Sequence, residues 1–354
     1  MEHELLSDKN FWEDLYRELN KSKKKVYMQF MTFEGDKTGL RLASKLIELK
    51  KRGVDVKVLI DRFTDYYVSD TYYKNPSVKK EVISTKKMIQ KMEKEGIKIK
   101  RTRPYGFLKC FFLARNHKKI IIIDDFCYLG GINISDHNFS WHDFMVKINK
   151  KDSVKIILED FKNTFNGKER DYKSKDVFTN KFLEELYYSL IIGAKKEIII
   201  SSPYVLDISL IRLFKKNMNA KKILLTLKKN NYNIINKTSG YLNKKLKEDG
   251  AEIFNYPFFS HAKFLLVDRE KLLIGSSNFG QESFLFKQEI GILIKDKKFI
   301  NGFVDKMYEE HKHNLIKYRS KKENLFMPII LVYLSYFLMQ IFSKFFFRGV
   351  KPIG

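Results

Sequence analysis

One eight-residue pattern occurs twice in this chain and constrains its fold more than any other feature. The pattern is a histidine, a lysine two positions later and an aspartate five positions after that, and it spans 117–124 and 261–268. Each copy leads through an apolar run to a glycine and an asparagine three positions apart, at 130–133 and 275–278. The offset of 144 residues (261 minus 117) predicts a duplicated fold in which two halves contribute to one site.

Strand and helix patterns alternate around both copies. In the first half, the patterns predict strands at 26–32, 54–61, 97–100, 119–124 and 126–129 and helices at 38–51 and 78–95. In the second half, they predict strands at 197–201, 222–227, 252–256, 263–267 and 271–274 and helices at 182–194, 208–217 and 239–248. Alternation of this kind predicts an α/β fold.

The same patterns divide the chain into two lobes and a tail. A polar stretch at 166–178 predicts a linker between a first lobe, 1–165, and a second lobe, 179–318. The basic and apolar tail, 319–354, contains a run at 325–342 without a charged residue. This run is close to the shortest that forms a spanning helix. Three interpretations stay open: a short spanning helix, a helix lying in the membrane interface, and a helix docked on the second lobe.

The formal net charge of +26 indicates an anionic partner, either nucleic acid or a membrane rich in anionic lipid. Because lysines are spread along the whole chain, a general lysine bias explains the charge equally well, and the charge alone does not select a substrate. The two cysteines, Cys110 and Cys127, lack metal-ligand spacing and lie in apolar or aromatic surroundings. We expect buried, unpaired thiols, which fit a reducing compartment.

The residue types of the repeated pattern suit phosphodiester chemistry without a metal or another cofactor. Such a reaction needs a nucleophile, an acid for the leaving alkoxide and positive charge near the non-bridging oxygens. Imidazole titrates near neutrality, so one neutral histidine can attack phosphorus while a protonated one donates to the leaving oxygen. Each lysine shares a strand face with its histidine, and the asparagines add amide donors. The candidate catalytic residues are His117, Lys119, Asp124, Asn133, His261, Lys263, Asp268 and Asn278.

The two aspartates of this set end their motif strands. For Asp124 and Asp268 we favour a role in fixing the turn and balancing local charge over a direct part in the reaction. The other five histidines match neither copy of the pattern, and we interpret them as surface or packing residues. They are His3, His137, His142, His311 and His313.

The repeated pattern is the signature of the phospholipase D superfamily, which the chain resembles. Within that superfamily, stretches at and beyond the motifs are most similar to the bacterial cardiolipin synthases. The resemblance covers the chain from residue 20 to residue 310. The stretches that carry it are Gly39–Asp61, Asn116–Ile120, Gly130–Ile134, Trp141–Asp143, Ser202–Tyr204 and Asp249–Ile253. The chain differs from those synthases in two places. The segment between Asp124 and Gly130 is one residue shorter, and 278–283 lacks their N-x-D-x-R-S pattern.

The resemblance implies a bilobal fold in which each lobe is an α/β/α sandwich with a mixed sheet and the active site lies on the pseudo-twofold axis between the lobes. It implies that His117 is the nucleophile and His261 the general acid. It also implies an acidic residue in each lobe that orients the histidine of the other, so that Glu289 pairs with His117 and Asp143 with His261. No cofactor or metal is expected, and one chain is sufficient for a complete site.

The approaches to the two motifs favour a lipid substrate over nucleic acid. Both are aromatic and aliphatic, as an entrance for acyl chains would be, although packing in an ordinary core is the other interpretation. A nuclease would line them with bases and stacking aromatics, yet the first contains only Lys109 and Arg115. The apolar residues are Tyr105, Phe107, Leu108, Phe111, Phe112 and Leu113 before the first motif and Tyr256, Pro257, Phe258 and Phe259 before the second.

The sequence therefore predicts a membrane-associated phosphatidyltransferase that resembles cardiolipin synthase. It would join two phosphatidylglycerols through a phosphohistidine and release glycerol, at the cytoplasmic face of the cell membrane, where the tail would hold it. The expected partners are an anionic phospholipid substrate and the membrane surface. Two alternatives stay open: a phospholipase D-type hydrolase of phospholipids, and a nuclease or phosphodiesterase of the same superfamily that acts on nucleic acid.

Overall fold

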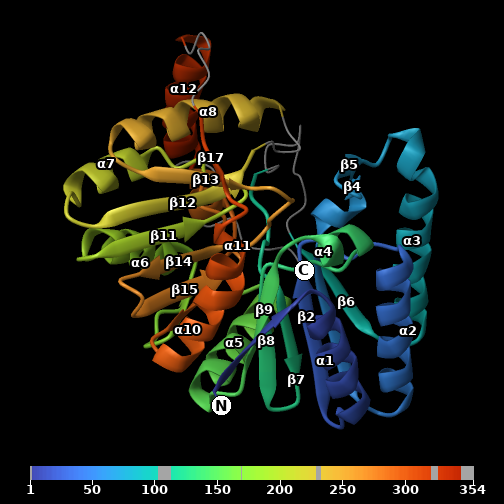
Figure 1. Cartoon of the computed structure of the whole chain (residues 1–354). Coiled ribbons are helices and arrows are strands. Elements are labelled where there is room, and N and C mark those ends of the chain that lie inside the picture. Colours follow the sequence, from blue (N-terminus) through green and yellow to red (C-terminus); the bar gives the residue numbers. More distant parts are fainter. Residues whose placement is uncertain (1, 103–112, 169, 229–232, 320–325, 344–354) are drawn as a thin grey trace. The chain divides into compact units, whose positions relative to one another are not determined.

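The computed structural model describes residues 2–102, 113–168, 170–228, 233–319 and 326–343 (Figure 1). The chain divides into two compact units, Met1–Tyr172 and Lys173–Val350. Each unit has its own mixed sheet with helices on both faces, and each is described by itself. The predicted class, an α/β fold with a mixed sheet in each half, is confirmed.

Seven strands form the sheet of the first unit. β2, β3 and β6 run parallel to one another, and the other neighbouring strands are antiparallel. The motif strand, β7, pairs on one side with its return strand and on the other with the parallel group. The strands are, in spatial order, β1 (His3–Ser7), β9 (Phe144–Ile148), β8 (Phe126–Gly130), β7 (Ile120–Ile123), β2 (Lys25–Phe30), β3 (Asp55–Asp61) and β6 (Lys98–Thr102).

Helices cover both faces of this sheet, as the alternating side chains of β2 show. Val26 and Met28 lie in the main core with the first three helices, whereas Tyr27 stacks on Phe161 of the last helix with ring centroids 5.1 Å apart. The helices are α1 (Asp8–Lys21), α2 (Lys37–Lys51), α3 (Lys79–Lys94), α4 (Asp136–Ser140) and α5 (Lys151–Phe165). Between β3 and α3 lie η1 (Arg62–Asp65), a hairpin of β4 (Tyr67–Val68) and β5 (Thr71–Tyr72), and η2 (Pro76–Val78).

Eight strands form the sheet of the second unit, which repeats the central arrangement of the first. β11, β12 and β13 run parallel, and the motif strand, β14, lies between its return strand, β15, and β11. The strands are, in spatial order, β10 (Val177–Thr179), β16 (Ile290–Ile294), β15 (Lys271–Gly275), β14 (Phe264–Val267), β11 (Glu197–Ser201), β12 (Lys221–Leu227), β13 (Glu252–Tyr256) and β17 (Ile316–Lys317).

The helices of the second unit also lie on both faces of its sheet. Leu265 and Val267 of β14 belong to the core under α6 and α7, while Phe264 meets Phe303 of α10 with ring centroids 5.1 Å apart. The helices are α6 (Asn180–Ile192), α7 (Ser209–Lys216), α8 (Asn233–Glu248), α9 (Gln281–Phe286), α10 (Lys297–Val304), the π-helical η4 (Asp305–Glu309), α11 (Glu310–Lys312) and α12 (Phe326–Phe342).

The structure departs from the sequence expectation mainly outside the motif strands. The predicted helix 239–248 begins six residues earlier, at Asn233, and the outer strands β1, β9, β10 and β16 were not predicted. Cys127 is buried and unpaired, as expected, whereas Cys110 lies outside the described residues. None of the helices that the structure describes is long and apolar enough to cross a bilayer.

Candidate active site

Two histidine–lysine pairs with the same local geometry stand at the starts of the two motif strands. His117 and Lys119 precede β7, His261 and Lys263 precede β14, and all four are at most 6% exposed. The Lys119 ammonium donates to the main-chain carbonyl of His117 at 2.6 Å, and Lys263 does the same to His261 at 2.5 Å. Each half therefore holds a lysine ammonium at a fixed place on the main chain of its own histidine.

Asp61, at the end of β3, fixes the residues before His117. Its carboxylate accepts from the main-chain N–H of Asn116 at 2.7 Å and forms a buried ion pair with Arg115 at 3.0 Å. Burial raises the pKa of Asp61 to about 6, although the Arg115 guanidinium acts against this shift. The Arg115 side chain is 2% exposed and bound to Asp61, so this base of the first approach is already neutralised within the first unit.

The lysine between His117 and Lys119 points away from them. The Lys118 ammonium binds both carboxylate oxygens of Asp160 on α5, at 2.7 and 2.9 Å, in a fully buried pair. Alternation along an extended chain accounts for this, since neighbouring side chains leave on opposite faces. Sequence reasoning missed the pair because Asp160 follows 42 residues later inside an amphipathic helix.

The two motif aspartates lie at the far ends of the motif strands. Asp124 accepts hydrogen bonds from the main-chain N–H groups of residues 23–25 at 2.9–3.0 Å, and Asp268 from residues 195–197 at 2.7–3.1 Å. Burial disfavours their charged forms, but the backbone donors outweigh it and hold the pKa of both carboxyls below the ordinary value. Five residues of extended chain, about 16 Å, separate Lys119 from Asp124. The structure therefore places neither aspartate beside the histidine of its motif.

The asparagines follow the return strands and are buried. Asn133 is 8% exposed, and its Oδ1 accepts from the main-chain N–H of Thr32 at 3.4 Å. Asn278 is 3% exposed, and its Oδ1 is buried with no hydrogen-bond partner among the described residues. The Asn278 Oδ1 can therefore accept a further hydrogen bond.

The two predicted orienting carboxylates occupy equivalent places and differ in how they are held. Asp143 directly precedes β9, Glu289 directly precedes β16, and both are 1% exposed. Asp143 packs against Gly131, where a Cβ atom would lie 2.4 Å from both carboxylate oxygens. Any side chain at Gly131 would therefore displace Asp143.

In the second half, Ser276 stands at the position that Gly131 has in the first. Its hydroxyl donates to Oε2 of Glu289 at 2.5 Å and accepts from the main-chain N–H of Ile290 at 3.1 Å. A hydroxyl donor stabilises the ionised form of a buried carboxylate. The sequence shows this contrast as Gly-Gly against Gly-Ser, but it does not show that either residue touches a carboxylate.

The aromatic approaches are described only in part. Residues 105–112 lie outside the described residues, and Leu113 beside them is 39% exposed. In the second approach, Tyr256 belongs to the core, where its hydroxyl donates to the Met307 carbonyl at 3.1 Å. Phe258 is 39% exposed. In the second approach, Tyr256 therefore packs in an ordinary core, whereas Phe258 is exposed.

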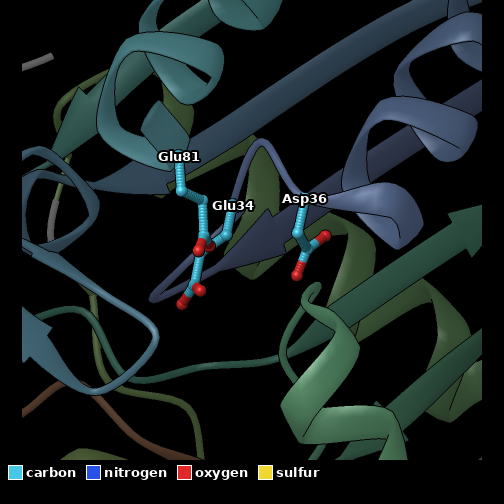
Figure 2. A group of neighbouring side chains, drawn as sticks. All are labelled: Glu34, Asp36 and Glu81. Atoms are coloured by element: carbon cyan, nitrogen blue, oxygen red, sulfur yellow. The ribbon is translucent and has the colours of Figure 1, made fainter. Parts of the chain in front are cut away.

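A cluster of three carboxylates that the sequence did not predict lies in the first unit, outside the motifs (Figure 2). Glu34, Asp36 and Glu81 have oxygens within 4.8 Å of one another, a spacing that could hold a metal ion. Burial raises the pKa of Glu34 to about 9 and that of Asp36 to about 6. Ser69, at the tip of the β4–β5 hairpin, donates its N–H to Glu34 at 2.9 Å and its hydroxyl to Glu81 at 2.8 Å. The group therefore anchors the hairpin.

Known proteins resemble the chain over most of its length. Residues 15–165 and 187–311 match the family described as "Cardiolipin synthase, PLD-like domain". The cardiolipin synthase of Listeria welshimeri is 25% identical over 344 residues, which cover 84% of this chain and 66% of the relative. That of Clostridium perfringens is 25% identical over 354 residues, which cover 86% and 68%. The chain thus spans about two thirds of the length of these relatives.

Solved structures share the fold at low sequence identity. The phosphatidylserine synthase of Haemophilus influenzae superposes with a TM-score of 0.72 at 14% identity, covering 97% of this chain and 94% of that one. The polyphosphate kinase of Porphyromonas gingivalis superposes with a TM-score of 0.62 at 10% identity, covering 96% and 56%. The expected duplicated fold is therefore confirmed. Structural similarity at such low sequence identity shows the fold and does not identify the reaction.

Proposed function

Because the chain belongs to the cardiolipin synthase family, with its phospholipase D-like domain, we propose that it is a phosphatidyltransferase that joins two phosphatidylglycerols into cardiolipin. The observation that carries the proposal is the repeated geometry of the two histidine–lysine pairs, each buried with the ammonium anchored on the carbonyl of its own histidine. A duplicated arrangement of this kind supports a reaction that needs one imidazole as nucleophile and another as acid.

The proposed reaction has two steps that share one phosphoryl group. In the first, neutral His117 attacks phosphorus of phosphatidylglycerol, the bond to the glycerol oxygen breaks, and protonated His261 gives its proton to the departing alkoxide. In the second, a hydroxyl of another phosphatidylglycerol gives its proton to His261 and attacks the phosphohistidine. The phosphorus–nitrogen bond breaks, cardiolipin leaves, and both histidines return to their starting states. Lys119 and Lys263 would stabilise charge on the non-bridging oxygens.

The proposal assigns supporting roles to the other buried polar groups. Glu289 would hold the ring of His117 and Asp143 that of His261, so that each imidazole keeps the tautomer its step requires. Asn133 and Asn278 would donate amide hydrogen bonds to the phosphate. We place no metal or cofactor in the reaction, and we propose that one chain makes a complete site.

Two features support a phospholipid rather than a nucleic acid as substrate. Arg115 and Lys118, the bases next to the first motif, form buried ion pairs with Asp61 and Asp160 and do not form a track for a phosphate backbone. The curated relatives are named for a phospholipid product. We further propose that the enzyme works at the cytoplasmic face of the cell membrane and binds there through residues 319–354.

Product analysis tests the proposal directly. Purified protein is incubated with phosphatidylglycerol vesicles and a metal chelator, and lipids and glycerol are measured by mass spectrometry. We expect cardiolipin and free glycerol from the wild type and from His313→Ala, which alters an exposed histidine, but a rate at least about a thousandfold lower from His117→Ala. Phosphatidic acid in place of cardiolipin would make the protein a hydrolase. Cleavage of DNA or RNA with no lipid product would contradict the proposal.

A further inference from the structure

Helix α12 has an inner face that packs on the second unit. Val332 is 5% exposed and lies in a small apolar cluster with Tyr241 and Leu242 of α8, and α12 lies beside α8 in Figure 1. The helix also contacts α9, which begins three residues after Asn278. The inner face therefore connects α12 to the segment that follows the second motif.

The opposite side of α12 is apolar and exposed. Its large side chains are 40–59% exposed and recur at intervals of three and four positions, so that they lie on one side of the helix. This outer face consists of Ile330, Leu334, Phe337, Leu338 and Phe342, with Tyr333 at its edge, where its ring meets that of Tyr241 on α8 at 6.4 Å. Other large apolar side chains that are exposed in the described part of the chain are scattered over several elements. A continuous apolar stripe of this kind marks an interaction surface.

Basic residues flank α12 in the sequence. Lys245 of α8 pairs with Glu248 at 2.7 Å and also interacts electrostatically with Tyr333. The sequence from 324 to 354 contains no acidic residue. The basic residues that flank the helix in the sequence are Lys321, Lys322, Lys344, Arg348 and Lys351. An apolar helix face with basic residues before and after it in the sequence is complementary to a lipid surface that carries negative head groups.

We propose that the outer face of α12 inserts, in the plane of the membrane, into an anionic phospholipid surface while the inner face stays on α8. The inference rests on the proposed function, which is the reason for choosing lipid over a second protein as the occupant. The packed inner face excludes lipid from one side of the helix. The seventeen helical residues that the structure describes at α12 are about 26 Å long, shorter than the roughly 30 Å hydrocarbon core. In an in-plane position the inner face therefore stays packed on α8 while the outer face contacts lipid. Through the contact of α12 with α9, this position brings the second half of the site to the lipid.

Vesicle flotation with the full chain tests the surface. The outer-face variant is Leu334→Gln/Phe337→Gln/Leu338→Gln, and the matched control, Ile83→Gln/Ile192→Gln/Met218→Gln, changes as many exposed apolar side chains elsewhere. On phosphatidylglycerol vesicles we expect the outer-face variant to bind at least about tenfold more weakly than the wild type and the control to bind like the wild type. Equal melting temperatures by circular dichroism show that all three chains are folded. Wild-type binding by the outer-face variant would overturn the inference.

Depth measurements test the in-plane orientation. Environment-sensitive dyes are attached to Ile330→Cys and Phe342→Cys, twelve positions or about 18 Å apart along the helix, with Met218→Cys as a site that should stay in water. Quenching by lipids spin-labelled at different depths should place the dyes at 330 and 342 at the same shallow depth. Depths that differ by most of the helix length would overturn the in-plane position in favour of a spanning helix.

Turnover separates this inference from the proposed function. If the wild type binds vesicles through the outer face but forms no phospholipid product, the inference stands and the proposed function is refuted. If the wild type forms cardiolipin and the outer-face variant binds vesicles normally, the proposed function stands and the inference is refuted. The outer face could also join two copies of the chain. A wild-type dimer in sedimentation, a monomeric variant and unchanged vesicle binding would show this and would overturn the lipid assignment.

Discussion

At the scale of single residues, the two halves of the site are equivalent in position but not in chemistry. Gly131 leaves space for the Asp143 carboxylate, whereas Ser276 donates a hydrogen bond to Glu289. A carboxylate that is buried without its donor is harder to ionise, because desolvation penalises the charged form. The second half therefore uses a hydroxyl at the position where the first half has a glycine.

Removing that hydroxyl should alter the pH dependence of the reaction. In Ser276→Ala, Glu289 loses its donor, and we expect kcat to fall by about tenfold and the acid limb of the pH–rate profile to move to higher pH. Ser276→Thr should restore both, since it keeps the hydroxyl. Ser277→Ala is the matched control, because Ser277 is equally buried and donates only to the Asn278 carbonyl. An unchanged profile in Ser276→Ala would contradict a positioning role.

The motif aspartates should act on stability and not on turnover. Asp124 accepts three backbone hydrogen bonds, and the same contacts lower its pKa. Because a depressed carboxyl pKa contributes stability above the unfolded value, this contribution is lost as the pH falls through the folded pKa. Asp124→Asn should lower the free energy of unfolding by about 1 kcal/mol at neutral pH and leave kcat of the folded protein within about threefold. Urea unfolding beside a kcat measurement checks this, and a thousandfold loss of kcat at unchanged stability would refute it.

At the scale of elements, the sequence predicts the motif strands well because their signal is local. The predicted strand 119–124 appears as β7 at 120–123, and the strand 263–267 as β14 at 264–267, since a run of β-branched and aliphatic residues needs no distant partner to be recognised. Strand β9 contains Lys147 in place of an apolar residue, and a partner from α1, Asp14, neutralises it at 3.1 Å. Patterns that depend on a partner elsewhere in the chain are not visible in a local window.

The cluster of three carboxylates under the β4–β5 hairpin also depends on residues that are far apart in the sequence. Glu34 and Glu81 meet because the fold places the loop after β2 near the first turn of α3, and neither segment carries a motif. Around Glu34 the facing titratable groups are Glu81, Asp36, Asp70 and His137. With a pKa of about 9, Glu34 stays protonated at neutral pH and can hold the hairpin without charge repulsion.

This proton should make stability fall as the pH rises. Glu34 has a raised folded pKa, so the folded state keeps a proton that the unfolded chain has lost above about pH 4.3. Between pH 6.5 and 8.5 the free energy of unfolding should fall by up to about 1.4 kcal/mol per pH unit from this group. Glu34→Gln, which mimics the neutral form, should remove that slope. Urea unfolding at several pH values measures it, with Glu2→Gln as an exposed control. Parallel slopes in wild type and Glu34→Gln would refute the assignment.

At the scale of the whole molecule, the duplication explains what one sequence can and cannot predict about the site. Both motif strands occupy the same place in their sheets, and both histidine–lysine pairs have the same geometry, as expected from a repeated pattern. A repeat does not say which half supplies the nucleophile, because the motifs are alike. The assignment of His117 to that role, and the crossed pairing with Glu289, rest on the family resemblance and stay predictions.

A substrate that needs no acid can separate the two roles. In a synthetic phosphatidyl p-nitrophenol, the leaving group departs as a stable anion, so the first step requires the nucleophile and its orienting carboxylate but not the general acid. Under the crossed pairing, His261→Ala and Asp143→Asn should give a burst of p-nitrophenolate and trap the phosphohistidine, while His117→Ala and Glu289→Gln should not.

The same four variants on phosphatidylglycerol provide the comparison, because all of them should be slowed there by at least about tenfold. The decisive pair is Asp143→Asn and Glu289→Gln, which remove a charge and keep the shape. If each carboxylate instead served the histidine of its own unit, the burst would appear in Glu289→Gln and disappear in Asp143→Asn. The leaving group thus tests both the order of the two histidines and the crossing between the halves, which no pattern within one half can reveal.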